Sequence, residues 1–274
     1  MVLLGRRLAV SIPDSVLEDK ESQRDKTAKL GLMARACAIY GVDLIEVFRD
    51  RERHGEGEAI RRVLEYLETP QYLRKRLYPL DETLRYAGML PPLRIPSHKI
   101  KVSTDRLSLG EVREGVVNSD GTVDIGLDSA FALEGDAAPG KRVTVKVTST
   151  QPPLAVQIPR DRVNGYWGYR VEMKSVYDVI SDARFSVKVA TSRLGAPIAE
   201  SLARLRASLR SGGSVKLIFG SPSRGLYDMA GRELDKRVGF VVNLYPEQHV
   251  ETVRTEEAIF AGLSLVSILS AEKA

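Results

Sequence analysis

The sequence predicts an α/β fold in which a parallel sheet is interrupted by a small β-barrel. Short apolar segments alternate with helical periodicity in the first 89 residues and again from residue 166 onward, and parallel strands need such long crossovers. Between these regions, residues 90–165 contain short alternating strands and tight turns. We therefore expect an α/β domain made of residues 1–89 and 166–274, with a β domain of residues 90–165 inserted into it.

The N-terminal region follows the order strand, helix, strand, helix. The apolar run 7–12 predicts a strand, and residues 20–40 carry apolar side chains at helical intervals before Gly41, which predicts the end of a helix. Residues 42–48 predict a second buried strand, and residues 58–68 place apolar side chains on one helical face. This pattern is typical of neighbouring parallel strands.

The inserted region is predicted to be a small antiparallel barrel. Residues 112–117 and 122–127 flank the turn Asn118-Ser-Asp-Gly, in which Gly121 can supply the positive φ of a hairpin. Residues 142–148 alternate between apolar and polar side chains, as a half-buried strand does.

After the insert, the α/β alternation resumes. Strands are predicted at residues 186–190, 215–219 and 240–244, and helices at residues 197–209 and 255–269. Only a short polar segment separates the last two strands. The C-terminal region is therefore expected to complete the sheet begun by the first 89 residues.

Composition restricts the function classes. The net charge of +5, from 41 basic and 36 acidic residues, suits an anionic partner such as RNA but does not establish one. Cys37 is the single cysteine, and His54, His98 and His249 are widely separated, so we expect no disulfide and no metal site. The apolar runs are too short for a membrane span, and the N-terminus lacks the order of a secretory signal, so we expect a cytoplasmic protein that does not bind membranes.

One candidate site is the loop Gly220-Ser-Pro-Ser-Arg-Gly225, which directly follows an apolar strand. Its glycines and proline force a turn that leaves backbone amides free for a ligand, although an ordinary connection explains the same residues. Leu226 stands where a P-loop requires lysine, which argues against that mode of nucleotide binding. The pair Gly55 and Gly57 lacks the third glycine of a dinucleotide fingerprint.

A second candidate site is the long polar loop between the last strand and the last helix. Thr255 is predicted to cap that helix, and Glu256 and Glu257 then occupy its first turn, where the helix dipole favours carboxylates. Capping accounts for the acids but not for a loop that also carries Asn243 and Arg254. We therefore favour a functional loop.

Three segments carry a resemblance to a known superfamily. Thr191-Ser-Arg-Leu-Gly, Phe219-Gly-Ser-Pro-Ser-Arg-Gly-Leu and Asn243-Leu-Tyr-Pro-Glu-Gln-His-Val-Glu-Thr-Val-Arg-Thr-Glu-Glu-Ala resemble the SPOUT RNA methyltransferases, and the last segment is the most specific. The interrupted layout is similar to the archaeal and eukaryotic RNA uridine-N3 methyltransferases that carry an OB-like insert. The resemblance covers nearly the whole chain. It implies a trefoil knot, a homodimer, S-adenosylmethionine as methyl donor, and a base of ribosomal RNA, with uridine N3 the suggested position, as acceptor.

The resemblance also implies the site residues. The residues implied to bind the cofactor are Thr191, Ser192, Arg193, Phe219, Gly220, Ser221, Pro222, Asn243, Leu244, Pro246, Gln248, Val250, Glu251, Thr252, Thr255 and Ala258. Asn243 and Arg254 are expected to orient the target base or its phosphate, and Glu256 to accept a proton. Each of these three side chains could instead be structural.

The sequence also suggests which surfaces bind RNA and a second copy of the chain. The insert offers positive charge from Lys99, Lys101, Arg106, Arg113, Lys141, Arg142 and Lys146, and aromatic residues Tyr166, Trp167 and Tyr169 at its exit that we assign to the core or an interface. The last helix has an apolar face of Ile259, Leu263 and Val266, which we expect a partner subunit to cover. The alternative function is a non-catalytic RNA-binding or ribosome assembly factor that retains the knotted dimer.

Overall fold

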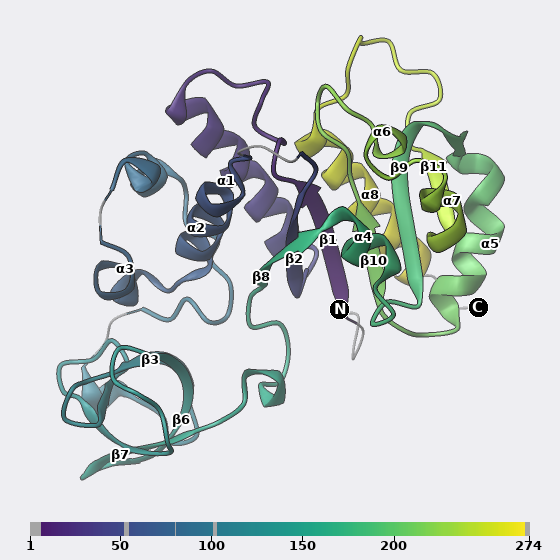
Figure 1. Ribbon diagram of the computed structural model, residues 1–274. Helices are drawn as coiled ribbons and strands as arrows, with labels where there is room; N and C mark the ends of the chain where they lie inside the picture. Colours follow the sequence, from purple (N-terminus) through teal and green to yellow (C-terminus); the bar gives the residue numbers. More distant parts are fainter. Residues whose placement is uncertain (1–6, 52–54, 80, 101–102, 272–274) are drawn as a thin grey trace. The chain divides into compact units, whose positions relative to one another are not determined.

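A computed structural model describes residues 7–51, 55–79, 81–100 and 103–271 and divides the chain into two compact units (Figure 1). The α/β unit comprises Met1–Glu65, Thr83–Pro91 and Tyr169–Ala274, and the barrel unit comprises Tyr66–Glu82 and Pro92–Gly168. The barrel unit thus takes in residues 66–82, which the sequence boundaries assign to the α/β domain.

The α/β unit alternates strands and helices along the chain. Its strands are β1 (Leu8–Pro13), β2 (Leu44–Arg49), β8 (Arg170–Ser175), β9 (Val187–Pro197), β10 (Val215–Ile218) and β11 (Phe240–Asn243). Its helices are α1 (Gln23–Ile39), α4 (Val176–Ser181), α5 (Ile198–Arg210), α6 (Leu226–Ala230), α7 (Glu233–Arg237) and α8 (Thr255–Ala271), and α2 (Gly57–Glu68) begins within it. Gly41 follows α1 with a φ of 68°, which confirms the predicted helix end.

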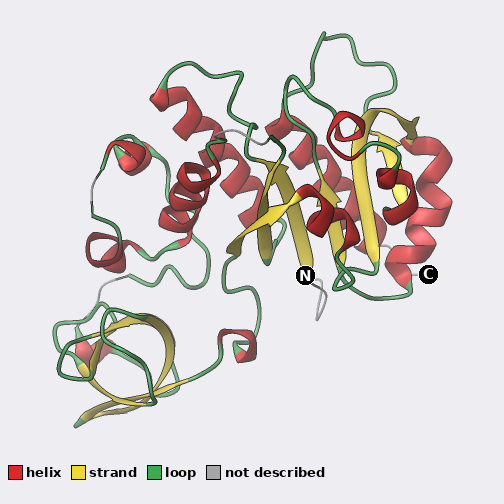
Figure 2. Cartoon of the chain, in the orientation of Figure 1, coloured by secondary structure: helices red, strands yellow, loops and turns green. Residues whose placement is uncertain are grey.

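The six strands form one parallel sheet in the order β11–β9–β10–β1–β2–β8, which confirms the predicted parallel α/β architecture (Figure 2). Every residue of β1 and β10 is buried, as expected for central strands covered on both faces. On one face, Ile218 packs with Leu226 of α6 and Leu234 of α7. On the other face, α8 contacts α1 and α5, and Gly262 lets α8 approach Leu217 closely.

Two parts of the α/β unit differ from the sequence prediction. The segment 220–239, predicted to be a polar connection, contains the short helices α6 and α7. The backbone amide of Gly225 donates to the carboxylate of Asp228 at 2.9 Å, and this local cap starts α6. The strand β8 and the helix α4 were also not predicted; α4 starts with a capping box between Ser175 and Asp178.

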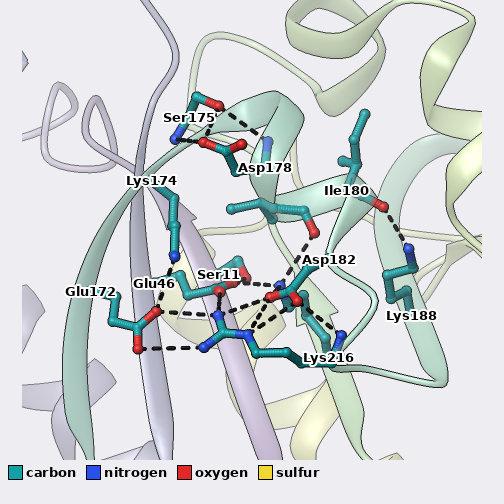
Figure 3. Close-up of polar contacts among 12 residues, drawn as sticks. Ser11, Glu46, Glu172, Lys174, Ser175, Asp178, Ile180, Asp182, Lys188 and Lys216 are labelled. Atoms are coloured by element: carbon teal, nitrogen blue, oxygen red, sulfur yellow. Dashed lines mark hydrogen bonds and ion pairs between the residues drawn. The ribbon is translucent and has the colours of Figure 1, made fainter.

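A buried ion cluster attaches the segment after α4 to the centre of the sheet (Figure 3). Lys216 on β10 has its Nζ atom 2.7 Å from Oε2 of Glu46 on β2 and 2.9 Å from Oδ2 of Asp182. The side chains of Lys216 and Glu46 are fully buried, and the Ser11 hydroxyl donates to Glu46 at 2.7 Å. Since a buried charge is costly without partners, each of these groups depends on the others.

The apolar face predicted for the last helix is covered by this chain itself. Ile259, Leu263 and Val266 are each no more than 1% exposed in the single chain. The expectation that a partner subunit covers them is therefore wrong, because α8 lies with this face on its own sheet.

The barrel unit contains a closed five-stranded barrel, as the sequence predicts. Its elements are α3 (Gln71–Leu77), β3 (Val112–Val117), β4 (Thr122–Asp124), β5 (Phe131–Glu134), β6 (Arg142–Thr150) and β7 (Pro153–Gln157). All neighbouring strands are antiparallel except β5 and β7, which pair in parallel. The strand predicted to run to residue 127 ends at Asp124, whose carboxylate accepts the Gly126 amide at 2.9 Å and turns the chain. Valine, isoleucine and leucine side chains fill the interior around Phe131.

Two of the basic residues expected to face RNA have structural roles instead. Arg113 is 1% exposed and donates to the carbonyl of Ile125 and the carboxylate of Glu111. Arg142 pairs with Glu68 at 2.7 Å and with Glu114 at 2.6 Å. Lys99, Arg106, Lys141 and Lys146 are exposed, and Lys101 lies outside the described residues. The exposed charge of the barrel is therefore smaller than the sequence suggests.

Of the three aromatic residues at the exit of the insert, Trp167 and Tyr169 are buried as predicted for core residues, whereas Tyr166 is half-buried. Trp167 is 8% exposed, and its indole N–H donates to Glu114 at 2.6 Å. Tyr169, in the α/β unit, is 1% exposed and donates to the carbonyl of Leu64 at 2.9 Å. Within the described part of the chain, no helix is both long enough and apolar enough to cross a membrane.

Candidate functional site

A pocket of about 420 Å³ lies at the carboxyl ends of β9, β10 and β11. Its volume is within the range of small-molecule sites, and the carboxyl edge of a parallel sheet is where such sites form. Three segments make its walls: residues 191–194, 219–228 and 243–258. The lining residues are Thr191, Ser192, Arg193, Leu194, Phe219, Gly220, Ser221, Pro222, Ser223, Arg224, Gly225, Tyr227, Asp228, Asn243, Leu244, Tyr245, Gln248, Glu251, Thr252, Val253, Thr255 and Ala258.

The first wall is an excursion of β9 away from its neighbour. Ala190 pairs with Val241, but the next residue of β11, Val242, pairs with Ala196, so residues 191–195 bulge out between the two pairs. A Cβ atom at Gly195 would lie 2.8 Å from the backbone of Val241. Glycine is therefore required where the excursion returns to the sheet.

The second wall is the tight loop after β10. A Cβ atom at Gly220 would lie 3.0 Å from the carbonyl oxygen of Arg224, and the Ser221 amide donates to that same oxygen at 3.0 Å. The guanidinium of Arg224 donates to the carbonyl of Asp50 at 2.8 Å and to that of Asp228 at 3.1 Å. These bonds hold a compact turn against the end of β2.

The third wall is the polar loop that leads into α8. Nδ2 of Asn243 donates to the carbonyl of Arg193 at 3.2 Å, and Oδ1 of Asn243 accepts the Tyr245 amide at 2.9 Å. The Tyr245 hydroxyl donates to the carbonyl of Glu257 at 3.1 Å, which ties the loop to the first turn of α8. Asn243 thus links the first wall to the third through backbone groups.

Thr255 joins the second wall to the third. Its hydroxyl donates to the carbonyl of Gly220 at 3.3 Å, and it is the first residue of α8. The Glu257 carboxylate instead accepts the amide of Arg254 at 2.9 Å. The prediction that Thr255 is the N-cap is therefore wrong, although Glu256 and Glu257 do occupy the first turn as predicted.

Most residues expected to bind the cofactor line this pocket, although Pro246 and Val250 do not. Of the three residues expected to act on the substrate, Asn243 lines it, whereas Arg254 and Glu256 do not. Arg254 is exposed next to the wall residue Thr255. Glu256 is 5% exposed, with its carboxylate 3.4 Å from Nζ of Lys29 on α1.

The sequence reasoning missed several wall residues. Tyr227 and Asp228 belong to α6, and the spacing of Gly225 and Asp228 was the capping signal that could have revealed this helix. Arg224 was not assigned because its role depends on Asp50, which is distant in sequence. Tyr245 was also missed, because only the folded loop directs its hydroxyl toward α8.

A pair of carboxyl groups, Asp14 and Asp50, lies at the carboxyl ends of β1 and β2, and Asp50 also pairs with the wall residue Arg224 at 3.4 Å. Burial raises the pKa of Asp14 to about 6, and the hydrogen bond and charge of neighbouring Asp50 add to this effect. The Ser15 hydroxyl donates to Asp50 at 2.9 Å. Among the described residues, which exclude His54, no group of three or more histidine, cysteine, aspartate or glutamate side chains is placed to hold a metal ion.

The chain is similar in sequence to a family of RNA methyltransferases and to several individual proteins. A family model described as "Putative RNA methyltransferase" matches residues 7–266. A protein of Halobacterium salinarum, described as uncharacterized, is 33% identical over 286 residues, which cover 95% of this chain and 98% of that protein. The 28S rRNA (uridine-N(3))-methyltransferase of Homo sapiens is 33% identical over 304 residues, covering 94% of this chain and 77% of the human protein. The Mus musculus enzyme of the same description is 32% identical, covering 94% and 75%. All three walls of the pocket lie within the residues that the family model matches.

Proposed function

The chain belongs to the RNA methyltransferase family, and we propose that it transfers a methyl group from S-adenosylmethionine to a base of ribosomal RNA, with N3 of a uridine as the acceptor. The family membership makes it a methyltransferase. The observation that carries the proposed donor is the pocket of three loops at the carboxyl edge of the sheet. The names of the human and mouse relatives support the proposed acceptor.

The walls fit an adenosyl group in chemistry as well as in size. Gly220 and Pro222 bring backbone groups to the pocket, and such groups can pair with the hydrogen-bonding edge of adenine. Leu244 and Val253 offer apolar side chains for the flat faces of the base. Bound S-adenosylmethionine would supply an activated methyl group on a sulfonium, so this chain has mainly to position the acceptor base and accommodate its proton.

We propose that Arg254 holds the RNA beside the pocket. Its guanidinium is exposed and has no hydrogen bond or ion pair to any residue that the structure describes, so it is available to a phosphate or base. Asn243 would act chiefly by holding the walls together, since both its polar atoms already bond to backbone. We assign no proton transfer to Glu256, because its pairing with Lys29 keeps it out of the walls.

We propose that the α/β unit has the knotted SPOUT fold. β11 lies at the edge of the sheet beyond β9, yet the helix that follows it returns to pack over β10. The C-terminal segment must therefore cross the loops after β9 and β10, and the hydroxyl of Thr255 contacts Gly220 at this crossing. Such a crossing supports a knot, which ordinary chain connections avoid.

We propose a homodimer formed through the helices on the α8 side of the sheet. Leu32 and Ile39 on α1 are 51% and 53% exposed, and Ile268 on α8 is 58% exposed. Because α1 and α8 pack together, we propose that these exposed side chains belong to the surface that a second copy of the chain would cover. The variant Ile268→Glu should shift the mass found by light scattering from dimer to monomer, and a wild-type monomer at micromolar concentration would refute the dimer.

We propose that the inserted barrel, an OB-like domain, contributes to RNA binding through its exposed lysines. Lys99, Lys141 and Lys146 are exposed and have no structural ion pair among the described residues. For single-stranded RNA, a plot of the logarithm of the binding constant against the logarithm of salt concentration should become steeper by about 0.7 for each lysine that pairs with a phosphate. Replacing the three lysines by glutamine should weaken RNA binding and reduce this slope, and an unchanged slope would exclude the barrel as an RNA-binding surface.

Two measurements test the function as a whole. Titration of the full chain with S-adenosylmethionine should show saturable binding by calorimetry. The alternative, a non-catalytic assembly factor, predicts no binding of the donor. Mapping methylated nucleotides in ribosomal RNA from cells with and without the protein should then reveal one uridine that loses its N3 methyl group. If the donor binds but no uridine loses its N3 methyl group, the result would support the proposed cofactor and contradict the proposed acceptor.

A further inference from the structure

The loop after β1 sends one carboxylate to the wall of the pocket formed by residues 219–228. Oε1 of Glu18 accepts the Ser221 hydroxyl at 2.9 Å and the Ser223 backbone amide at 3.1 Å, and it also accepts the Ser223 hydroxyl. Oε2 of the same side chain pairs with Arg51 at 2.5 Å. Ser221 and Ser223 line the pocket, whereas Glu18 does not. Any effect of Glu18 on a ligand must therefore pass through this loop.

The bond from Ser221 to Glu18 also orients the loop internally. The Ser221 hydroxyl accepts the backbone amide of Arg224 at 3.1 Å while it donates to Glu18. Because Glu18 takes the hydroxyl hydrogen, a lone pair of that oxygen is left to face the Arg224 amide. The carboxylate thus supports the turn that brings Gly220 close to the Arg224 carbonyl.

Glu18 is suited to hold the loop as an anion. Its side chain is 23% exposed. Burial alone would raise the pKa of Glu18, but the hydrogen bonds from Ser223, Ser221 and Arg51 outweigh burial and lower the pKa below its usual value. Hydrogen bonds to an ionised carboxylate are stronger than those between neutral groups. One residue therefore contributes several strong bonds to a short loop.

We propose that Glu18 is a positioning residue for the methyl donor, because it fixes the backbone of residues 221–224 in the shape that forms one wall of the donor pocket. The inference rests on the proposed function. A loop that is already ordered does not have to lose its freedom when the donor binds, so the affinity is higher than for a mobile loop. Without Glu18, binding of the donor would have to order the loop.

The variants Glu18→Ala and Glu18→Gln test this role, and Glu21→Gln is the matched control on an exposed glutamate of the same segment. Calorimetry on the full chain should give a Kd for S-adenosylmethionine about ten to a hundred times higher for Glu18→Ala, the range expected when a few charge-assisted hydrogen bonds are removed. Glu18→Gln keeps an oxygen acceptor, so its Kd should lie between that of wild type and that of Glu18→Ala. Glu21→Gln should bind as wild type does.

The kinetic pattern separates positioning from a general loss of structure. KM for the donor should rise in Glu18→Ala, while kcat at saturating donor stays close to that of wild type, because the ordered loop is recovered once the donor is bound. A double-mutant cycle with Ser223→Ala should show effects that are less than additive, since both changes remove the same hydrogen bonds. Additive effects, or a lower kcat with an unchanged KM, would overturn the proposal.

Hydrogen exchange provides a test that does not depend on the donor. The amides of Ser221 and of residues 223–226 should exchange faster in Glu18→Ala and Glu18→Gln than in Glu21→Gln, in the absence of any ligand. Equal exchange rates would overturn the role of Glu18. If the wild-type chain binds no S-adenosylmethionine, the proposed function fails, and the exchange rates still decide whether Glu18 orders the loop.

Discussion

Gly195 is the residue at which the first wall of the pocket depends most directly on the absence of a side chain. It lies where the excursion of β9 rejoins β11, and a Cβ atom there would be 2.8 Å from the carbonyl carbon and oxygen of Val241 and from the carbonyl carbon of Val242. Ordinary contacts of a Cβ atom begin near 3.4 Å. Because the obstacle is backbone held in a sheet, the excursion must move by several tenths of an ångström in Gly195→Ala.

The expected cost follows from overpacking. Adding a methyl group where no space exists costs about 1–3 kcal/mol. Since residues 191–194 line the pocket, we expect most of this cost to appear in donor binding, which corresponds to a Kd about 5 to 150 times higher. Calorimetric titration with S-adenosylmethionine measures this Kd. Gly88→Ala is the control, because a Cβ atom at Gly88 meets nothing within 4 Å. A Gly195→Ala protein that binds the donor as tightly as wild type would show that the excursion does not form a wall of the donor site.

Three further predictions concern other parts of the α/β unit. Asn243→Ala should weaken donor binding and methylation together, by about tenfold for the removal of two hydrogen bonds, because it disconnects two walls; a loss confined to kcat would instead support a direct role in orienting the base. Lys216→Met should lower stability by about 1.5–3 kcal/mol because the buried Glu46 carboxylate loses its ion pair with Lys216 and keeps the ion pair with Arg184 at 3.1 Å, and an unchanged calorimetric midpoint would contradict this. Asp14→Asn should have the same thermal midpoint as wild type at about pH 4 and a higher one at about pH 7.5. Burial and the neighbouring Asp50 raise the folded-state pKa of Asp14, so the protonated carboxyl stabilises the wild type at low pH, and this stabilisation is lost as the pH rises through about 6. Identical pH profiles for the two proteins would exclude this.

Sequence periodicity was sufficient to predict the parallel sheet and the barrel because both depend on local patterns. The strands β1 and β10 are apolar apart from Ser11 and Lys216, as is typical of strands buried on both faces. The end of α1 at Gly41 and the hairpin turn at Gly121 follow from the ability of glycine to adopt positive φ. Helices shorter than two turns, such as α6 and α7, give no periodicity to detect, and only the capping pair Gly225 and Asp228 signals one of them.

The sequence by itself determined the alternating α/β architecture, the inserted barrel and, through three short segments, most of the residues that line the pocket. Only the tertiary structure decided what their side chains contact. Nothing in the sequence distinguishes Glu256 and Arg113 from exposed charged residues. In the structure, however, Glu256 is buried beside Lys29, and Arg113 is buried in the barrel unit, where it donates to the carbonyl of Ile125. The bond from Glu18 to Ser221 joins positions that are far apart along the chain. Local patterns cannot specify such contacts, because the partner of a buried charge is chosen by which strands the fold places side by side.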